Sequence, residues 1–263
     1  HGNGGSARMM GWFGTAMARA GYVVIAVDHP GNNGGEPMTE AGSILMWNRV
    51  DDLAAALAAV RADPELATAV DTTRLGIAGY SAGGFTALVA AGARPDVQRL
   101  LAFCHAHPAD GVCAPQAETP GLTLARRVAA ADTPALTPWV ARAGDDRAIA
   151  GVGAVFLIAP AMVQAFAPEA LEKVTQPVSI IVGAADTVAS PATNSDTAAA
   201  ALPKATLTTL PAVGHYDFVS SCTALGQTRV GALCQVAADK QATHGAAITE
   251  ATALFDAALA ATR

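Results

Sequence analysis

LGIAGYSAG, residues 75–83, joins a short apolar run to a G-x-S-x-G pentapeptide centred on Ser81. The run FTALVAA, residues 85–91, follows almost at once and is typical of a buried helix. A G-x-S-x-G between a strand and a helix is typical of the nucleophile elbow, a strained turn that presents a serine hydroxyl at the end of a sheet. Glycines beside the serine let the strand and helix backbones approach without a Cβ between them. We therefore interpret Ser81 as a nucleophile.

A serine nucleophile needs a base that removes its proton and an acid that orients the base. At an elbow of this kind the chain order is serine, acid, histidine. Asp186 follows the apolar run 178–183, and His215 follows the run 205–210. Both residues fall on loops after expected strands, where an open parallel sheet places its ligands. We expect Ser81, Asp186 and His215 to form a catalytic triad.

Other residues could fill or share these roles. Asp186 could be a simple turn residue, and Asp196 and Asp217 are rival acids. His29 precedes the serine, so we expect it to form hydrogen bonds within the loops of the site rather than to act as the base. The histidines expected on the surface or in loops, and not as ligands, are His105, His107 and His244.

The first five residues, HGNGG, have the composition of an oxyanion-hole loop. Acyl transfer develops negative charge on oxygen, and preorganised backbone N–H groups stabilise that charge. We expect one N–H from Ala82, the residue after the nucleophile, and a second from Asn3. The alternative is a flexible glycine-rich segment without a role.

Apolar runs alternate with helical patterns along the chain, which predicts an α/β protein with a mostly parallel, doubly wound sheet. The expected strands are 22–27, 75–78, 155–159, 178–183 and 205–210, and the expected helices include 51–61 and 243–261. The pattern breaks down between residues 95 and 147 into Pro, Gly, Cys and His, which indicates an insertion or lid over a site. We expect one domain spanning residues 1–263.

Composition excludes several functional classes. Hydrophobic residues make up 52% of the 263 residues and charged residues 14%, enough for one large core. The net charge is −6 and no run of Lys or Arg occurs, which disfavours a nucleic-acid partner. No uninterrupted apolar stretch approaches the roughly 18 residues of a membrane span. Nothing in the sequence indicates the oligomeric state.

The four cysteines fall into two local pairs, Cys104 with Cys113 and Cys222 with Cys234. Four cysteines allow three connectivities, and the sequence does not choose among them. Short-range pairs in loops suggest disulfides and hence an oxidising compartment, secreted or periplasmic. The alternative is four reduced cysteines in a cytosolic enzyme. The spacings do not match a metal site, so we expect no metal.

Much of the chain resembles the dienelactone-hydrolase-like and platelet-activating-factor-acetylhydrolase-like branch of the bacterial α/β-hydrolases. The resemblance runs from His1 to about Phe255 and is carried by these segments: HGNGG at 1–5, AVDHPGN at 26–32, WNRVDD at 47–52, GYSAGG at 79–84, GAAD at 183–186 and GHYDF at 214–218. It implies a serine triad, ester hydrolysis without a cofactor, and a bridge between Cys222 and Cys234 near the histidine loop. True dienelactone hydrolases use a cysteine nucleophile where this chain has Ser81, so that substrate is not implied.

In the fold of that family the oxyanion loop follows a strand in the middle of the sheet. This chain begins at His1, so segments 22–27 and 75–78 would lack the strand between them. Unpaired buried backbone groups are costly, and open strand edges invite aggregation. We therefore expect an N-terminally truncated domain whose upstream part, with any signal peptide, is missing.

These observations predict a serine hydrolase that cleaves small to medium carboxylic esters through an acyl-enzyme. An amidase, peptidase or acetylhydrolase would use the same mechanism, and the elbow does not separate them. A hypothesis from another class is a hydrolase-like binding protein without activity. The expected partner is a small-molecule ester.

Overall fold

The sheet of the computed structural model, which describes residues 1–260, contains four parallel strands in the order β1-β2-β3-β4. The strands are β1 (Leu75–Tyr80), β2 (Val152–Ile158), β3 (Val178–Gly183) and β4 (Ala205–Leu210). All three ladders are parallel, so the carboxyl ends of the strands lie along one edge of the sheet. The α/β fold with a parallel sheet, expected from the alternating pattern, is confirmed.

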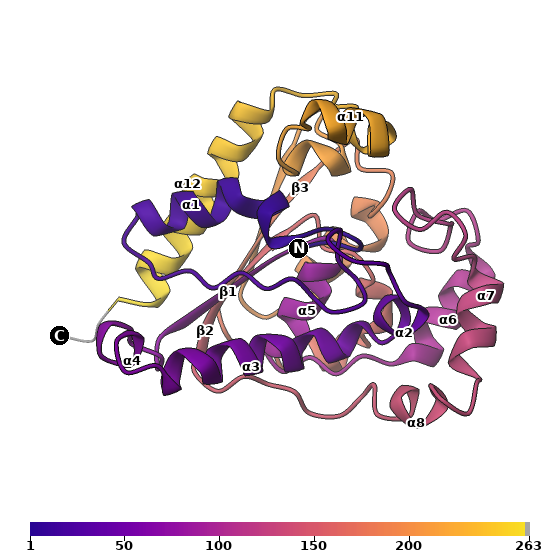
Figure 1. Cartoon of the computed structure of the whole chain (residues 1–263), viewed down its shortest axis with the longest axis horizontal. Coiled ribbons are helices and arrows are strands. Elements are labelled where there is room, and N and C mark those ends of the chain that lie inside the picture. Colours follow the sequence, from indigo (N-terminus) through magenta and orange to yellow (C-terminus); the bar gives the residue numbers. More distant parts are fainter. Residues whose placement is uncertain (261–263) are drawn as a thin grey trace.

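Helices cover both faces of the sheet, as Figure 1 shows. One apolar cluster joins Leu88 of α5 and Ala198 of α10 to the strands through Val155 and Ile180. A second cluster, on the other face, joins Phe13 of α1 and Phe255 of α12 to the sheet. The helices are α1 (Gly11–Arg19), α2 (Glu40–Ile44), α3 (Arg49–Ala62), α4 (Leu66–Ala69), α5 (Ala82–Ala90), α6 (Val97–Ala106), α7 (Leu124–Ala131), α8 (Thr137–Val140), α9 (Pro168–Leu171), α10 (Ser195–Ala201), α11 (Ala224–Val230) and α12 (Lys240–Ala258). Short 3-10 helices are η1 (Ala7–Met10), η2 (Met46–Asn48), η3 (Val163–Ala165), η4 (Pro191–Thr193), η5 (His215–Phe218) and η6 (Gly231–Cys234).

Burial explains why the central elements were visible in the sequence. Every residue of β3 is buried, and so are the last five residues of β2. Strands covered on both faces read as continuous apolar runs, which is the pattern at 178–183. All nine residues of α5 are buried as well, so its sequence is apolar all round.

The expected strand at 22–27 is wrong. The segment forms no ladder among the described residues, and Val23, Val24 and Ile25 are 57%, 40% and 42% exposed. A groove of about 700 Å³ separates it from β1, lined by residues 22–27 on one side and by Leu75–Gly79 on the other. The β-branched composition of this segment suits a strand. A strand also requires a neighbouring strand at about 4.8 Å, and here the groove lies where that neighbour would be.

The segment 95–147 contains α6, α7 and α8 and no strand (Figure 1). The periodicity of α7 is clear in its amphipathic sequence, whereas Pro and Gly interrupt the connections between these helices. The segment packs beside the strand ends rather than in the sheet. Its function as a lid stays a prediction.

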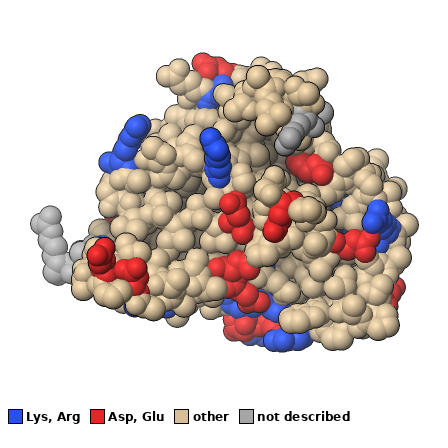
Figure 2. Space-filling view, viewed as in Figure 1, with Lys and Arg blue, Asp and Glu red and all other residues tan. Residues whose placement is uncertain are grey.

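Within residues 1–260 no helix combines the length and the apolar character that crossing a membrane requires. Figure 2 shows one face of the molecule, on which Lys and Arg side chains are scattered and do not form a continuous basic patch.

Candidate active site

Ser81 stands at the tight turn between β1 and α5. Its backbone angles are φ 55° and ψ −120°, a conformation that few L-residues adopt. A Cβ on Gly79 would collide with the carbonyl of Gly83, so the turn requires glycine at this position. Strain of this kind persists only where the surrounding structure enforces it, and it is concentrated at functional sites.

The structure brings Ser81, His215 and Asp186 into one hydrogen-bonded chain. His215 Nε2 lies 2.9 Å from Ser81 Oγ, and His215 Nδ1 lies 2.7 Å from Asp186 Oδ2. The other carboxylate oxygen of Asp186 accepts the N–H groups of Val188 and Ala189 at 2.9 and 2.8 Å. A carboxylate only accepts, so the His215 proton lies on Nδ1 and the Nε2 lone pair is free to accept from the serine hydroxyl.

All three side chains are buried: Ser81 is 7% exposed, and Asp186 and His215 are each 4% exposed. They come from the turn after β1, the loop after β3 and the loop after β4. In a parallel sheet these loops share one edge, which is why residues more than 100 positions apart in the sequence meet.

Neither rival acid forms a hydrogen bond with His215 in the described part of the chain. Asp196 is exposed on α10. Asp217 is buried, and its carboxylate accepts the N–H groups of Gly214 and Ala237 at 2.7 and 3.1 Å. Asp217 therefore shapes the histidine loop without joining the hydrogen-bonded chain.

Three other histidines form no hydrogen bond with the three residues of the hydrogen-bonded chain, within the part of the protein that the structure describes. His105 and His107 are exposed, as expected. His244 is half-buried on α12, where its ring stacks on Trp12 at a centroid distance of 3.8 Å. Packing between α1 and α12 accounts for His244, a role that the sequence did not indicate.

The N-terminal loop packs directly against the elbow. A Cβ on Gly2 would lie 3.1 Å from the Cβ of Ser81, so these backbones approach closely. Among the described residues, the backbone N–H groups of Asn3 and Ala82 donate to no other group of the protein. The Asn3 side chain accepts from Asn32 at 2.9 Å, which fixes the loop.

A cluster of polar side chains forms hydrogen bonds with the N-terminal loop. Arg49 donates from Nη2 to the carbonyls of His1 and Gly2 at 2.8 and 3.4 Å. The His29 ring pairs through Nδ1 with Asp52 at 2.8 Å, and the backbone N–H of His29 donates to His1 Nε2 at 3.2 Å. Burial lowers the pKa of His29 to about 4 and that of Arg49 to about 9. The backbone of His29 forms a hydrogen bond within the loops, as expected, but its ring bonds to Asp52 of helix α3 rather than to a loop. The support from Arg49 was not predicted.

The segment 95–147 reaches this site through residues 118 and 119. Thr119 accepts a hydrogen bond from the Asn3 side chain at 3.3 Å. Glu118 packs beside Gly4, and its buried Oε2 has no hydrogen-bond partner among the described residues. Burial raises the pKa of Glu118. Burial, and after it the Glu118 carboxylate, raises the pKa of the neighbouring Tyr216. Glu118 carries no local sequence signal, since only the fold brings it to the site.

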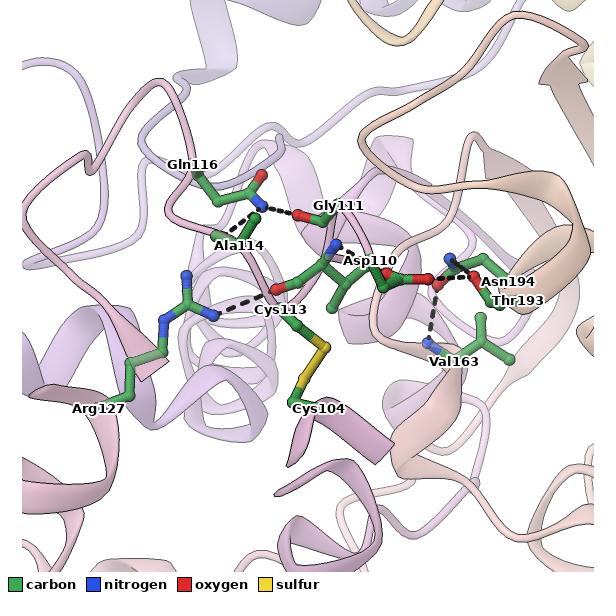
Figure 3. The surroundings of a disulfide bond; sticks show 11 residues. Cys104, Asp110, Gly111, Cys113, Ala114, Gln116, Arg127, Val163, Thr193 and Asn194 are labelled. Carbon is green, nitrogen blue, oxygen red and sulfur yellow. Dashed lines mark hydrogen bonds between the residues drawn. A yellow bond between two sulfur atoms is a disulfide. The ribbon is translucent and has the colours of Figure 1, made fainter. Parts of the chain in front are cut away.

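Two disulfides, Cys104–Cys113 and Cys222–Cys234, confirm the pairing of near neighbours. Figure 3 shows the first of them. Within the loop that it closes, Asp110 accepts from Thr193 Oγ1 at 2.9 Å. This bond ties the insertion to the segment that follows Asp186.

No group of three or more His, Cys, Asp or Glu side chains within the described residues is arranged to hold a metal ion.

The family model of the alpha/beta hydrolase family matches residues 1–225. A turn with a strained serine, hydrogen-bonded to histidine and aspartate at the edge of a parallel sheet, agrees with that match. The chain belongs to the alpha/beta hydrolase family. The particular branch expected from the sequence motifs is not shown. No curated protein matches the chain.

Solved structures resemble the chain over most of its length. A monoacylglycerol lipase from Paleococcus ferrophilus is 16% identical, with a TM-score of 0.51, and the alignment covers 96% of this chain and 92% of the lipase. A meta-cleavage product hydrolase from Pseudomonas fluorescens is also 16% identical, with a TM-score of 0.40 and coverage of 95% and 88%. The lipase supports the fold alone.

Proposed function

We propose that this protein is a serine hydrolase that cleaves small to medium carboxylic esters through an acyl-enzyme. The observation that carries the proposal is the continuous contact from Ser81 Oγ through His215 to Asp186, with both distances below 3 Å. A positioned base and an orienting acid are what a serine hydroxyl requires to become a nucleophile.

The geometry supports the following sequence of steps. Ser81 Oγ attacks the ester carbonyl carbon while its proton passes to His215 Nε2. Asp186 holds the ring and stabilises the imidazolium. His215 then gives the proton to the departing alcohol, which leaves an acyl group on Ser81. Water, deprotonated by His215, attacks this acyl group, and the carboxylic acid departs with the serine regenerated.

The oxyanion formed in each half-reaction needs donors that are already in place. We assign this role to the backbone N–H groups of Ala82 and Asn3. Support comes from their free donors and from the packing of the N-terminal loop against Ser81. Preorganised donors of this kind contribute about 10²–10³-fold each to turnover.

We assign the protein to an oxidising compartment, secreted or periplasmic in a bacterium. Support comes from the two disulfides, which account for all four cysteines. Disulfides persist outside the reducing cytosol.

A panel of p-nitrophenyl esters of increasing acyl length, run beside peptide amides, tests the proposed reaction. We expect turnover of the short and medium esters, with a burst of p-nitrophenol at the concentration of enzyme if deacylation is the slower step. Faster turnover of the amides would make the protein an amidase or peptidase. No turnover of either class would favour a binding protein.

A further inference from the structure

Lys240 occupies an unusual place for a cation. It is the first residue of α12, directly after the N-cap Asp239. The amino end of a helix carries partial positive charge, so a lysine there is unfavourable unless other groups compensate. Lys240 is also half-buried, and burial lowers its pKa. Its position needs a reason beyond helix formation.

The ammonium group of Lys240 is bound by three backbone carbonyls. Nζ donates to the carbonyls of Tyr216 and Val219 at 2.7 Å each, with that of Asp217 at 3.4 Å. These carbonyls lie at the end of η5, the short helix that begins with His215. The Tyr216 carbonyl also accepts the Val219 N–H, at 3.4 Å. The last carbonyls of a helix lack the partners that interior carbonyls have, so Lys240 adds donors to them as a C-terminal cap.

Other contacts hold the same turn from different directions. The Tyr80 hydroxyl donates to the carbonyl of His215 at 3.1 Å. The Asp217 carboxylate accepts the Gly214 N–H on the amino side of the turn. On the carboxyl side of the same turn, the Asp217 carboxylate accepts the Ala237 N–H at 3.1 Å, and His244 of α12 lies near the same carbonyls. Lys240 adds the shortest contacts there, at 2.7 Å, and links the turn to α12, which packs on the sheet.

We propose that Lys240 is a positioning residue, whose ammonium group holds the η5 turn so that His215 Nε2 stays within reach of Ser81 Oγ. The expected loss of turnover rests on the function proposed above, whereas the expected displacement of His215 does not. Reaction rates depend steeply on such placement, and a shift of about 1 Å costs on the order of 100-fold.

The test compares Lys240→Met, which keeps the length of the side chain but removes its donors, with Lys240→Arg. A matched control is Lys204→Met, at an exposed lysine before β4. We expect kcat for a p-nitrophenyl ester to fall about 10–100-fold in Lys240→Met with KM changed by less than about threefold. Lys240→Arg should recover most of kcat, because guanidinium also donates to several carbonyls. Lys204→Met should match the wild type.

A second readout does not depend on turnover. The proton between His215 Nδ1 and Asp186 gives a separate downfield signal in proton NMR. We expect this signal to broaden or vanish in Lys240→Met and to persist in Lys240→Arg and Lys204→Met. If the wild-type protein had no esterase activity, the proposed function would fail while this signal still tested the position of His215.

A Lys240→Met protein that kept both kcat within twofold and the downfield signal would overturn the proposal. If Lys240→Met did not fold, Lys240→Leu, which also lacks donors, would replace it with the same two readouts. Unfolding of both variants would also overturn it, because Lys240 would then serve global stability.

Discussion

At the scale of single residues, the two carboxylate oxygens of Asp186 have different roles. One carboxylate oxygen orients His215 and the other is held by two backbone N–H groups. Asn in its place would offer an amide that can present N–H to His215 and favour the wrong tautomer. We expect Asp186→Asn to fold normally and to lose about 10⁴-fold in kcat.

The matched control is Asp196→Asn, which changes the exposed rival acid on α10. It should keep wild-type kcat in the same p-nitrophenyl ester assay. Loss of turnover in Asp196→Asn with retention in Asp186→Asn would reverse the assignment.

His29 makes stability depend on pH. Burial lowers its pKa to about 4, against 6.5 for a free histidine, although the neighbouring Asp52 opposes the change. Between about pH 6.5 and pH 4, His29 therefore binds a proton in the unfolded chain but not in the folded one. The contribution to stability is complete above pH 6.5 and is lost as the pH falls towards 4, by about 2–3 kcal/mol at pH 4.5.

Urea unfolding at pH 7.5 and pH 4.5 measures this effect. His29→Gln should show a smaller loss between the two pH values than the wild type, by about 2–3 kcal/mol. His105→Gln, at an exposed histidine, should behave as the wild type. An equal loss of unfolding free energy between the two pH values in all three proteins would show that His29 does not cause the pH dependence.

At the scale of elements, the Cys222–Cys234 bridge closes the loop between the histidine turn and α12. A bridge across a loop of this length contributes on the order of 2–4 kcal/mol, in part by restricting the unfolded chain. We expect the double variant Cys222→Ala/Cys234→Ala to lose stability in that range and to lose activity, since the loop helps hold His215.

Gln235→Ala, at an exposed residue of the same loop, is the control and should change neither property. Mapping of non-reduced peptides by mass spectrometry checks the pairing itself. Four free thiols would contradict both the pairing and the oxidising compartment.

The sequence predicted those elements whose burial produces a continuous apolar run in the local sequence. The strand at 178–183 matches β3 to the residue because its side chains are buried on both faces. The segment 22–27 has an equally strong β-branched pattern, yet forms no strand, because strand formation depends on a partner that local sequence does not describe. Glu118 and Lys240 were missed for the same reason, since their contacts lie about 20 to 100 residues away.

At the scale of the whole molecule, a groove of about 700 Å³ beside β1 opens the core. We propose that this groove accepts one further parallel strand beside β1. The outer edge of β1 pairs with no strand in the described part of the chain, and apolar residues 23–25 are exposed across the groove from it. His1, which begins the loop at Ser81, lines this groove too.

The check is to extend the chain before His1 by a six-residue apolar strand sequence, with a Gly/Ser extension of equal length as the control. We expect residues 1–263 alone, and with the Gly/Ser extension, to be poorly soluble and weakly active. The apolar extension should raise solubility, the unfolding midpoint and kcat, because it fills the groove and fixes the loop of Asn3. A stable, fully active monomer without any extension would contradict this proposal.

The central claim is that Ser81 is a nucleophile activated by His215, and covalent labelling tests it most directly. A folded sample is treated with a fluorophosphonate, and the adduct is located by peptide mass mapping, with Ser81→Ala as the control. We expect one adduct per chain, on Ser81, with loss of ester turnover in step with labelling. The Ser81→Ala protein should bind no label and retain its fold. The absence of an adduct on Ser81 in folded protein, or near-wild-type turnover by Ser81→Ala, would contradict the claim.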